Sequence, residues 1–302
     1  MKKFIMYILV FFVVVIIIDQ FVGFVGDYML HNSKPSPAKQ FDDLCLNDNH
    51  DILIMGSSRA LHHYIPQIIG DTLCMDVYNA GYGGNGIILA YGILQMIIER
   101  EPPKYILYDI AWAFDLLVYE PDDNNTRYLS TLKKYRKHDG VAEVLKDISW
   151  GTYLKSFSGI YRYNSDLLNS IKYFWWGSTF YEDGYVPLYG ELNDSTRQNT
   201  EIELFAEDNT KIKYLHKFVQ TCQENDICLI FALSPQYGYI DERVIKLIKK
   251  ISEQYNITLL DYYDVFQNDM TLFQDELHMN DKGATEYSKK VAVSLREFIN
   301  SQ

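Results

Sequence analysis

The sequence is poor in basic residues, and this shortage narrows the partners the protein can have. The 302-residue chain has 28 Lys and Arg against 40 Asp and Glu, which gives a formal net charge of -12. Nucleic-acid-binding proteins present basic faces to the phosphate backbone, so we expect no nucleic-acid partner. Internal repeats and low-complexity segments are also absent from the sequence. With 48% hydrophobic residues, the chain can form one large domain with a full core.

Cysteine is scarce as well. Four cysteines are too few for a disulfide framework in a chain of this length: Cys45, Cys74, Cys222 and Cys228. No Cys-x-x-Cys motif occurs, so we expect no zinc site. We also expect no cofactor. In an oxidising compartment Cys45 can pair with Cys74, or Cys222 with Cys228, and four ordinary thiols are an equally good interpretation.

The N-terminus carries an unbroken apolar run. Lys2 and Lys3 precede this run, which extends from Phe4 to Ile18 and resumes after two polar residues as far as Val25. Its length approaches the roughly 20 residues that a helix needs to cross a bilayer. No polar face recurs at helical spacing, which argues against a buried helix of a soluble core.

This segment lacks the small residues of a cleavable signal peptide. Phe21 and Phe24 stand where cleavage after Gly23 or Gly26 requires small side chains. We therefore interpret residues 1–27 as an uncleaved transmembrane signal-anchor. The two lysines would keep the N-terminus in the cytoplasm, so we expect the rest of the chain outside it, in the periplasm or at the cell surface.

A polar segment and then an alternation of strands and helices follow the apolar run. Residues 28–50, with an extended Asn-Ser-Lys-Pro-Ser-Pro stretch, are expected to be a linker. Apolar strands are expected at residues 51–56, 74–79, 104–110, 227–233 and 257–261, and helices at about 60–69, 87–99, 201–224, 240–254 and 281–299. The alternation predicts an α/β domain over residues 51–302, with a parallel sheet covered on both faces.

Residues 112–200 interrupt this alternation with a long, partly helical and aromatic-rich segment. We interpret it as an insertion at the carboxyl ends of the strands, where open α/β sheets bind ligands. Its aromatic rings can stack on sugars, or they can fill a small core of the insertion itself. Trp175 and Trp176 are the better candidates for substrate contact, because adjacent side chains point in different directions and are rarely both buried.

A strand that stops at a glycine and presents a serine is the first candidate for chemistry. Ser58 follows Gly56 and Ser57 at the end of the first expected strand. A helix begins nearby, and its N-terminal amides can stabilise developing negative charge. The alternative interpretation is a simple turn with a helix cap. The next residue, Arg59, can bind an acidic group of the substrate or pair with Asp51 or Asp109.

An Asp-x-x-His motif before the last helix supports the catalytic interpretation. Asp275 can accept a hydrogen bond from one ring nitrogen of His278, which leaves the other nitrogen to act as a base. A glycine-rich segment, residues 79–86, follows the second expected strand. All three motifs lie at expected carboxyl ends of strands, so they can converge. His62 and His63 are expected on the surface or in the core rather than in catalysis.

These three motifs resemble the blocks of the SGNH (GDSL-like) hydrolase superfamily. The matching segments are Gly56-Ser-Ser58, Asn79-Ala-Gly-Tyr-Gly-Gly84 and Asp275-Glu-Leu-His278. The resemblance covers about residues 51–300, without the insertion. It implies a flavodoxin-like three-layer α/β/α sandwich and the hydrolysis or transfer of an acyl ester.

The resemblance also assigns roles to individual residues. It implies Ser58 as the nucleophile, His278 as the base and Asp275 as the residue that orients it. The backbone amides of Ser58 and Gly84 would form the oxyanion hole. We expect Arg59, Asn85, Trp175 and Trp176 to bind substrate.

Two departures from the family pattern bear on activity. Ser57 replaces the usual Asp, and this Gly-Ser-Ser variant resembles membrane-anchored members that act on cell-envelope polymers. The asparagine that usually follows the third strand is missing, since residues 108–115 read Tyr-Asp-Ile-Ala-Trp-Ala-Phe-Asp. Loss of one oxyanion donor can cost roughly 100- to 1000-fold in turnover. Asp109 and Asp115 in this segment are either structural or face the substrate.

The sequence therefore predicts an extracytoplasmic serine esterase or acyltransferase. The expected substrate is an envelope glycan that carries O-acyl groups, with O-acetyl first among them. The resemblance adds a membrane acyl-transfer protein as a partner. A glycan-binding or accessory protein without catalysis is the alternative, favoured by the missing asparagine. A dinucleotide-binding protein is a weaker one, because the glycines between Gly81 and Gly86 do not have Gly-x-Gly-x-x-Gly spacing.

Overall fold

The computed structural model describes residues 1–118, 125–164, 166–178, 181, 183–193, 206–237 and 242–301. They form two compact units. One unit comprises residues 1–47 and 124–180, and the other comprises residues 48–123 and 181–302. Most of the segment expected as an insertion therefore belongs to the same unit as the N-terminal helix, and not to the domain that begins near residue 51.

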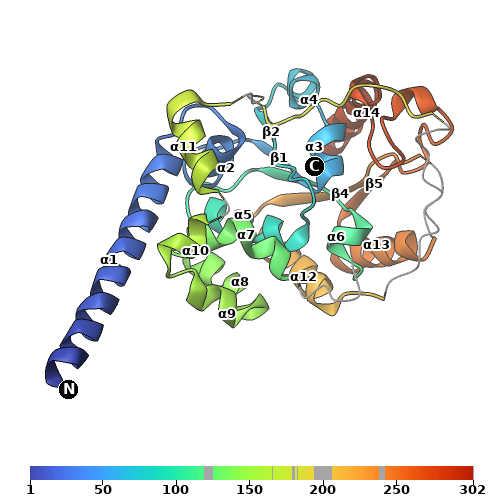
Figure 1. The fold of residues 1–302 in the computed structure, drawn as a ribbon. Coiled ribbons are helices and arrows are strands. Elements are labelled where there is room, and N and C mark those ends of the chain that lie inside the picture. Colours follow the sequence, from blue (N-terminus) through green and yellow to red (C-terminus); the bar gives the residue numbers. More distant parts are fainter. Residues whose placement is uncertain are drawn as a thin grey trace. The chain divides into compact units, whose positions relative to one another are not determined.

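The second unit is built on a five-stranded parallel sheet (Figure 1). Its strands are β1 (Ile52–Gly56), β2 (Val77–Asn79), β3 (Tyr105–Asp109), β4 (Cys228–Leu233) and β5 (Thr258–Asp261). They lie in the order β2-β1-β3-β4-β5, and every neighbouring pair is parallel. Each strand lies within the range expected from its apolar run, because strands buried on both faces are continuously apolar.

Helices cover both faces of this sheet, as the three-layer expectation requires. One face carries α3 (Ser58–His63), α4 (Pro66–Leu73) and α14 (Asp281–Asn300), and the other carries α5 (Ile87–Ile98) and α12 (Asn209–Glu224). Ile52 and Ile54 of β1 share a buried cluster with Val291 of α14. On the opposite face, the ring of Tyr108 in β3 lies 5.2 Å from that of Phe218 in α12. The remaining long helix, α13 (Glu242–Tyr255), precedes β5.

The strand order places a topological switch point at the carboxyl end of β1. The chain moves from β1 to one side to form β2 and to the other side to form β3, so the connections diverge there. Ligands of open α/β sheets bind at such a switch point. The helix expected at 60–69 is in fact two helices, α3 and α4, because Ile65 before Pro66 takes an extended conformation.

The first unit is helical. Its longest helix is α1 (Lys2–His31), which is long and apolar enough to cross a membrane. The other helices are α2 (Pro37–Leu46), η1 (Thr126–Tyr128), α7 (Leu129–Leu132), η2 (Lys133–Tyr135), α8 (Asp139–Ile148), α9 (Trp150–Lys155), α10 (Gly159–Tyr163) and α11 (Leu167–Trp176).

The presence of α2 corrects the expectation of a linker at residues 28–50. Ser36 caps this helix by accepting a hydrogen bond from the N–H of Lys39, and Pro37 occupies its first turn. Proline suits the first turn of a helix, since the N–H that it lacks has no helical partner there. Phe41 and Leu44 of α2 are buried, so the segment is a packed part of the first unit and not an extended tether.

Candidate active site

The strand-to-helix turn after β1 presents Ser58. Gly56 has φ of +144°, and a Cβ at this position would lie 2.6 Å from the carbonyl oxygen of Asp109. Only glycine adopts this conformation readily, which explains the tight turn expected from the sequence. Ser57 caps α3 and is buried, whereas Ser58 is the first residue of the helix and half-buried. Ser57 is therefore the helix cap, and Ser58 is the serine whose hydroxyl is available for chemistry.

Ser58, His278 and Asp275 form a continuous line of hydrogen bonds. The Oγ of Ser58 lies 2.8 Å from Nε2 of His278. On the other side of the ring, Nδ1 lies 2.9 and 3.0 Å from the two carboxylate oxygens of Asp275. Because a carboxylate only accepts hydrogen bonds, Nδ1 carries the proton and Nε2 accepts from the serine hydroxyl. This is the geometry that nucleophilic catalysis by serine requires.

A tight turn between η3 (Met270–Leu272) and α14 holds the acid and the base together. Phe273 and Met279 pair across its base. The Oδ1 of Asp275 accepts hydrogen bonds from the N–H groups of Leu277 at 2.8 Å and His278 at 2.9 Å. Burial raises the pKa of Asp275, but the hydrogen bond and charge of His278, together with these N–H groups, outweigh it and leave this pKa below its usual value. The carboxylate is therefore held in the charged form that orients the imidazole.

Behind His278 lies a second histidine that the sequence analysis placed outside catalysis. His63 is fully buried, and its Nε2 accepts a hydrogen bond from the N–H of Met279 at 3.0 Å. Its Nδ1 must then carry a proton, which it donates to Ser234 Oγ at 3.0 Å, and Ser234 donates to Asp109 Oδ2 at 2.9 Å. Burial first, and then the nearby charges of His278 and Arg59, hold the pKa of His63 well below its usual value. These hydrogen bonds of the neutral His63 ring fix the backbone next to His278.

Arg59 is not available to substrate. It is buried, and its guanidinium donates to the carbonyl of Ile110 and to Oε1 of Gln236, with Asp109 Oδ2 3.7 Å from its Nε. The sequence left open whether Arg59 binds an acidic substrate group or pairs with Asp51 or Asp109. In the structure it pairs with Asp109. The substrate-binding assignment of Arg59 is therefore corrected, because every direction of its planar fork is directed into the protein.

Asp115 and Asp109, which the sequence left undecided, are both structural. The carboxylate of Asp115 is fully buried and accepts hydrogen bonds from the N–H of Ile87 at 2.7 Å, the hydroxyl of Tyr108 at 2.8 Å and the N–H of Ala111 at 2.6 Å. Burial raises its pKa to about 7 against these hydrogen bonds. Asp115 thereby ties the start of α5 to the segment after β3.

The glycine-rich loop after β2 is fastened to the same turn as Ser58. The N–H of Tyr82 donates to the carbonyl of Gly56 at 3.0 Å, and that of Ala80 donates to Ile54 at 2.7 Å. Gly84 and Asn85 lie further along this loop, where the side chain of Asn85 donates to the carbonyl of Gly83 at 3.1 Å. The oxyanion role of Ser58 and Gly84, and the substrate role of Asn85, stay predictions.

Trp175 and Trp176 are exposed, as expected, but they belong to the first unit at the end of α11. Their contact with substrate stays a prediction. Phe180, another aromatic residue of the expected insertion, lies outside the described residues, as do the first residues of the helices expected at 201–224 and 240–254.

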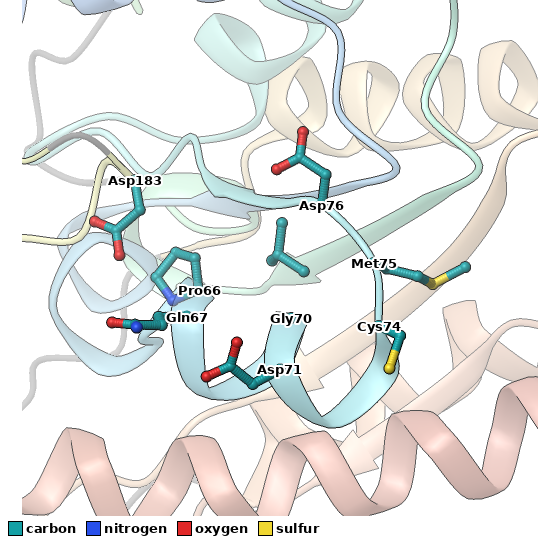
Figure 2. Close-up of a pocket in the computed structure, with 9 residues that line it drawn as sticks. Pro66, Gln67, Gly70, Asp71, Cys74, Met75, Asp76 and Asp183 are labelled. Atoms are coloured by element: carbon teal, nitrogen blue, oxygen red, sulfur yellow. The ribbon is translucent and has the colours of Figure 1, made fainter.

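The second unit also has a surface hollow of about 590 Å³ between α4 and β2 (Figure 2). Its lining includes Gln67, Asp71, Cys74, Asp76 and Asp183. None of the three residues of the Ser58 site lines it. Within the described ranges, no cluster of three or more His, Cys, Asp or Glu has the arrangement of a metal site. All four cysteines fall in these ranges, and no disulfide joins them.

Comparisons with known proteins give only distant structural likenesses. No family model and no curated protein matches the chain. Among solved structures, one described as a lipolytic protein of the G-D-S-L family from Desulfitobacterium hafniense DCB-2 has a TM-score of 0.39 and 13% identity, over 80% of this chain and 99% of that one. An acylhydrolase structure from Bacteroides fragilis NCTC 9343 has a TM-score of 0.42 and 10% identity, over 86% and 94% of the two chains.

An acetyl xylan esterase structure has a TM-score of 0.41 and 12% identity, and the match covers 82% of this chain and 99% of that one. Likenesses this distant do not bear on chemistry. What the structure itself defines is an α/β protein with a parallel sheet and a serine, a histidine and an aspartate in one hydrogen-bonded line.

Proposed function

We propose that this protein is a serine esterase or acyltransferase that uses Ser58, His278 and Asp275. The observation that carries the proposal is the 2.8 Å contact between Ser58 Oγ and His278 Nε2, with Asp275 on the far side of the ring. Ser58, at the start of α3, and His278, in the turn before α14, are 220 positions apart in sequence. Their alignment at the switch point of the sheet supports catalysis over a chance surface contact.

The reaction follows from the direction of the hydrogen bonds. Ser58 Oγ attacks the carbonyl carbon of an ester while its proton passes to His278 Nε2, and Asp275 stabilises the resulting imidazolium. The tetrahedral oxyanion is held by backbone N–H groups, for which we propose Ser58 and Gly84. Its collapse breaks the ester C–O bond, and His278 returns the proton to the departing alcohol. Water or a sugar hydroxyl then attacks the acyl-serine by the same steps in reverse.

For the substrate we propose O-acyl groups, and O-acetyl first, on a glycan of the cell envelope. Exposed Trp175 and Trp176 are suited to stacking on sugar rings. The helix α1 would anchor the protein in the membrane with both compact units outside the cytoplasm, since Lys2 and Lys3 precede its apolar run. Retention of α1 is supported by Gly23, Gly26 and Leu30, which are buried in the first unit.

A non-catalytic glycan-binding or accessory protein is the second candidate. It is favoured by the segment after β3, where no asparagine is present as a side-chain oxyanion donor. Asp109 and Asp115 in this segment are buried and engaged by backbone and hydroxyl donors. An oxyanion hole made of backbone N–H groups alone would make turnover slow but would leave Ser58 activated by His278.

The test uses the full-length chain in detergent micelles. Labelling by a fluorophosphonate probe and turnover of an aryl acetate are compared between wild type, Ser58→Ala and His278→Ala, with His216→Ala on α12 as a histidine control outside the site. We expect both activities to fall by at least about 1000-fold in the first two variants and to stay unchanged in the control. Folded wild-type protein that neither labels nor turns over the ester would contradict catalysis and favour the glycan-binding alternative.

A further inference from the structure

The helix α1 changes its surroundings abruptly along its length. From Phe4 to Ile18 every large apolar side chain is exposed. Beyond this run, Gly23, Gly26 and Leu30 are buried against other helices of the first unit. The change begins at Asp19, the first acidic residue of the helix. The first half of α1 is thus free to enter a bilayer, whereas the second half is part of a packed unit.

Asp19 holds the start of α10 against α1. Its carboxylate accepts hydrogen bonds from Ser158 Oγ at 2.6 Å, the N–H of Gly159 at 3.0 Å and the N–H of Ile160 at 3.1 Å. One residue on, the side chain of Gln20 donates to the carbonyl of Phe157 at 3.0 Å. Residues 157–160 are therefore fixed at the level of α1 where the exposed apolar run ends.

The length of α1 indicates where this level lies in a membrane. A hydrocarbon core of about 30 Å takes about 20 helical residues at 1.5 Å each. Counted from Lys3, these residues end near Gly23, so Asp19 lies inside the outer edge of the apolar layer. A carboxylate at this depth needs donors from the protein because water is scarce there. Ser158, Gly159 and Ile160 supply them, which brings the neighbouring side chains to the same depth.

Those neighbouring side chains are apolar and exposed. Trp150 is 57% exposed, Leu154 55%, Phe157 46% and Ile160 49%. Aromatic rings run along this surface, with Trp150 5.3 Å from Tyr153 and Tyr153 5.4 Å from Phe157.

Basic groups lie against the same rings. The guanidinium of Arg136 is 4.3 Å from the ring centre of Phe157, and the ammonium of Lys146 is 4.8 Å from that of Tyr153. Aromatic rings together with basic groups are typical of protein surfaces at the interface between lipid and water.

We propose that α9 and the start of α10 form a second membrane contact beside α1, and we call Trp150, Leu154, Phe157 and Ile160 the interfacial patch. Its occupant is the headgroup and upper acyl region of the bilayer into which α1 inserts. In Figure 1, α10 lies beside the C-terminal half of α1, where Gly159 packs against Asp19 and Gly23. The patch makes up for an apolar run that is shorter than the bilayer, and it limits the tilt of the first unit on the membrane.

The same unit provides an internal control. α11 contacts α1 further along, where the ring of Phe174 lies 5.9 Å from that of Tyr28. Just beyond the end of α1, the N–H of Lys34 donates to the carbonyl of Tyr173. Tyr28 is nine residues beyond Asp19 on α1, which corresponds to about 14 Å further from the membrane. Trp176 at the end of α11 should therefore stay in water. This proposal rests on the membrane location proposed for α1, but not on the esterase chemistry.

The test uses the full chain in lipid nanodiscs of phosphatidylcholine and phosphatidylglycerol with brominated acyl chains. Two single-tryptophan proteins are compared: one keeps Trp150, the other keeps Trp176, and the remaining three tryptophans are replaced by Phe in each. Co-purification with the nanodisc reports insertion of α1 independently of the patch. We expect bromolipid to quench Trp150 at least twofold more than Trp176, and aqueous acrylamide to show the reverse order.

A second comparison uses Leu154→Ser/Ile160→Ser against Leu168→Ser, an exposed leucine on α11, in the protein that keeps Trp150. The double substitution should reduce bromolipid quenching of Trp150, and the control should not. The proposal fails if, in nanodiscs that contain the protein, Trp150 and Trp176 are quenched to the same extent by acrylamide and equally little by bromolipid. The bilayer would then not cover the interfacial patch. Esterase turnover measured on the same samples decides the proposed function separately.

Discussion

At the scale of single residues, the site depends on partners that are remote in sequence. His63 reaches Ser234 across 171 positions, and Ser234 reaches Asp109 across 125. This series of hydrogen bonds ends at the backbone N–H of Met279, the residue after His278. These hydrogen bonds hold the backbone beside His278, while Ser58, His278 and Asp275 form the hydrogen-bonded line of the proposed site.

A substitution of His63 tests this positioning role. We expect His63→Ala to lower kcat of ester turnover by roughly 10- to 100-fold with KM little changed, because displacement of a catalytic group by about 1 Å costs up to this much. The rate of fluorophosphonate labelling should fall in parallel, and Ser234→Ala should reproduce part of the loss. A His63→Ala protein that melts normally and labels at the wild-type rate would contradict the role.

Asp115 gives a prediction for the pH dependence of stability. Its pKa of about 7 in the folded chain lies above the ordinary value of 3.8. The folded state therefore binds more protons than the unfolded state between about pH 4 and pH 7, and this carboxyl lowers the free energy of unfolding as the pH rises through that window. A shift of this size corresponds to at most about 4 kcal/mol.

Asp115→Asn removes this titration and also one of the hydrogen-bond acceptors, which costs about 1–3 kcal/mol at any pH. We expect the free energy of unfolding of the wild type, relative to the variant, to be larger at pH 4.5 than at pH 7.5. Denaturant titrations of both proteins at the two pH values measure the difference. Parallel pH profiles would show that Asp115 does not titrate in this range.

The hydrogen-bonded line of Ser58, His278 and Asp275 could be predicted from the sequence, but the residues that support it could not. Ser58, Asp275 and His278 each follow a strand or precede a helix in a recognisable pattern, and carboxyl ends of parallel strands meet at one edge. By contrast, a lone buried histidine such as His63 has no signal in a single sequence. The sequence also left the partner of Arg59 open between Asp51 and Asp109, and the parallel register places Asp109 beside Gly56, at the end of β1 that Arg59 follows.

At the scale of elements, the contact between α1 and α10 depends on glycine. A Cβ at Gly159 would lie 2.3 Å from the carbonyl oxygen of Asp19 and 2.4 Å from the backbone nitrogen of Gly23. The two helices thus meet backbone to backbone, as membrane-associated helices do at small residues. The contact lets the start of α10 reach the carboxylate of Asp19.

Gly159→Leu should force the two helices apart and destabilise the first unit by at least about 1–3 kcal/mol, the usual cost of overpacking. Gly151→Leu on α9 is the matched control, since the nearest atom to a Cβ there is 3.9 Å away. Thermal unfolding in detergent and limited proteolysis within residues 125–164 report the change. Equal melting of the two variants would show that the close approach is not needed.

The elements of the sheet were predictable from their apolar runs, while α2 was not. Proline at residues 35 and 37 suggested an extended chain, yet Pro37 sits where a helix accepts it and Ser36 caps the turn. The sequence alone does not distinguish a proline in the first turn of a helix from a proline that prevents a helix. They differ in whether the following residues, such as Phe41 and Leu44, find a surface to pack on.

At the scale of the whole molecule, the division into two units was not predictable. The sequence suggested one domain with an insertion, because residues 112–200 lie between strands of one sheet. The structure groups residues 124–180 with residues 1–47. The contacts that join these two segments include the hydrogen bonds of Asp19 with Ser158 and of Asp27 with Arg162 and Tyr163. Such residues have no periodicity that a single sequence could reveal.

The pairing of Asp19 with Ser158 also sets an order of events during synthesis. The two residues are 139 positions apart, so at about 5–20 residues per second the ribosome makes the partner roughly 7 to 28 s after the carboxylate. During that interval α1 has left the ribosome and carries an acidic group that nothing yet covers. The first helix to be made is thus among the last to have its contacts completed, and a chain arrested before residue 158 would carry α1 without the hydrogen bonds that Ser158, Gly159 and Ile160 donate to Asp19.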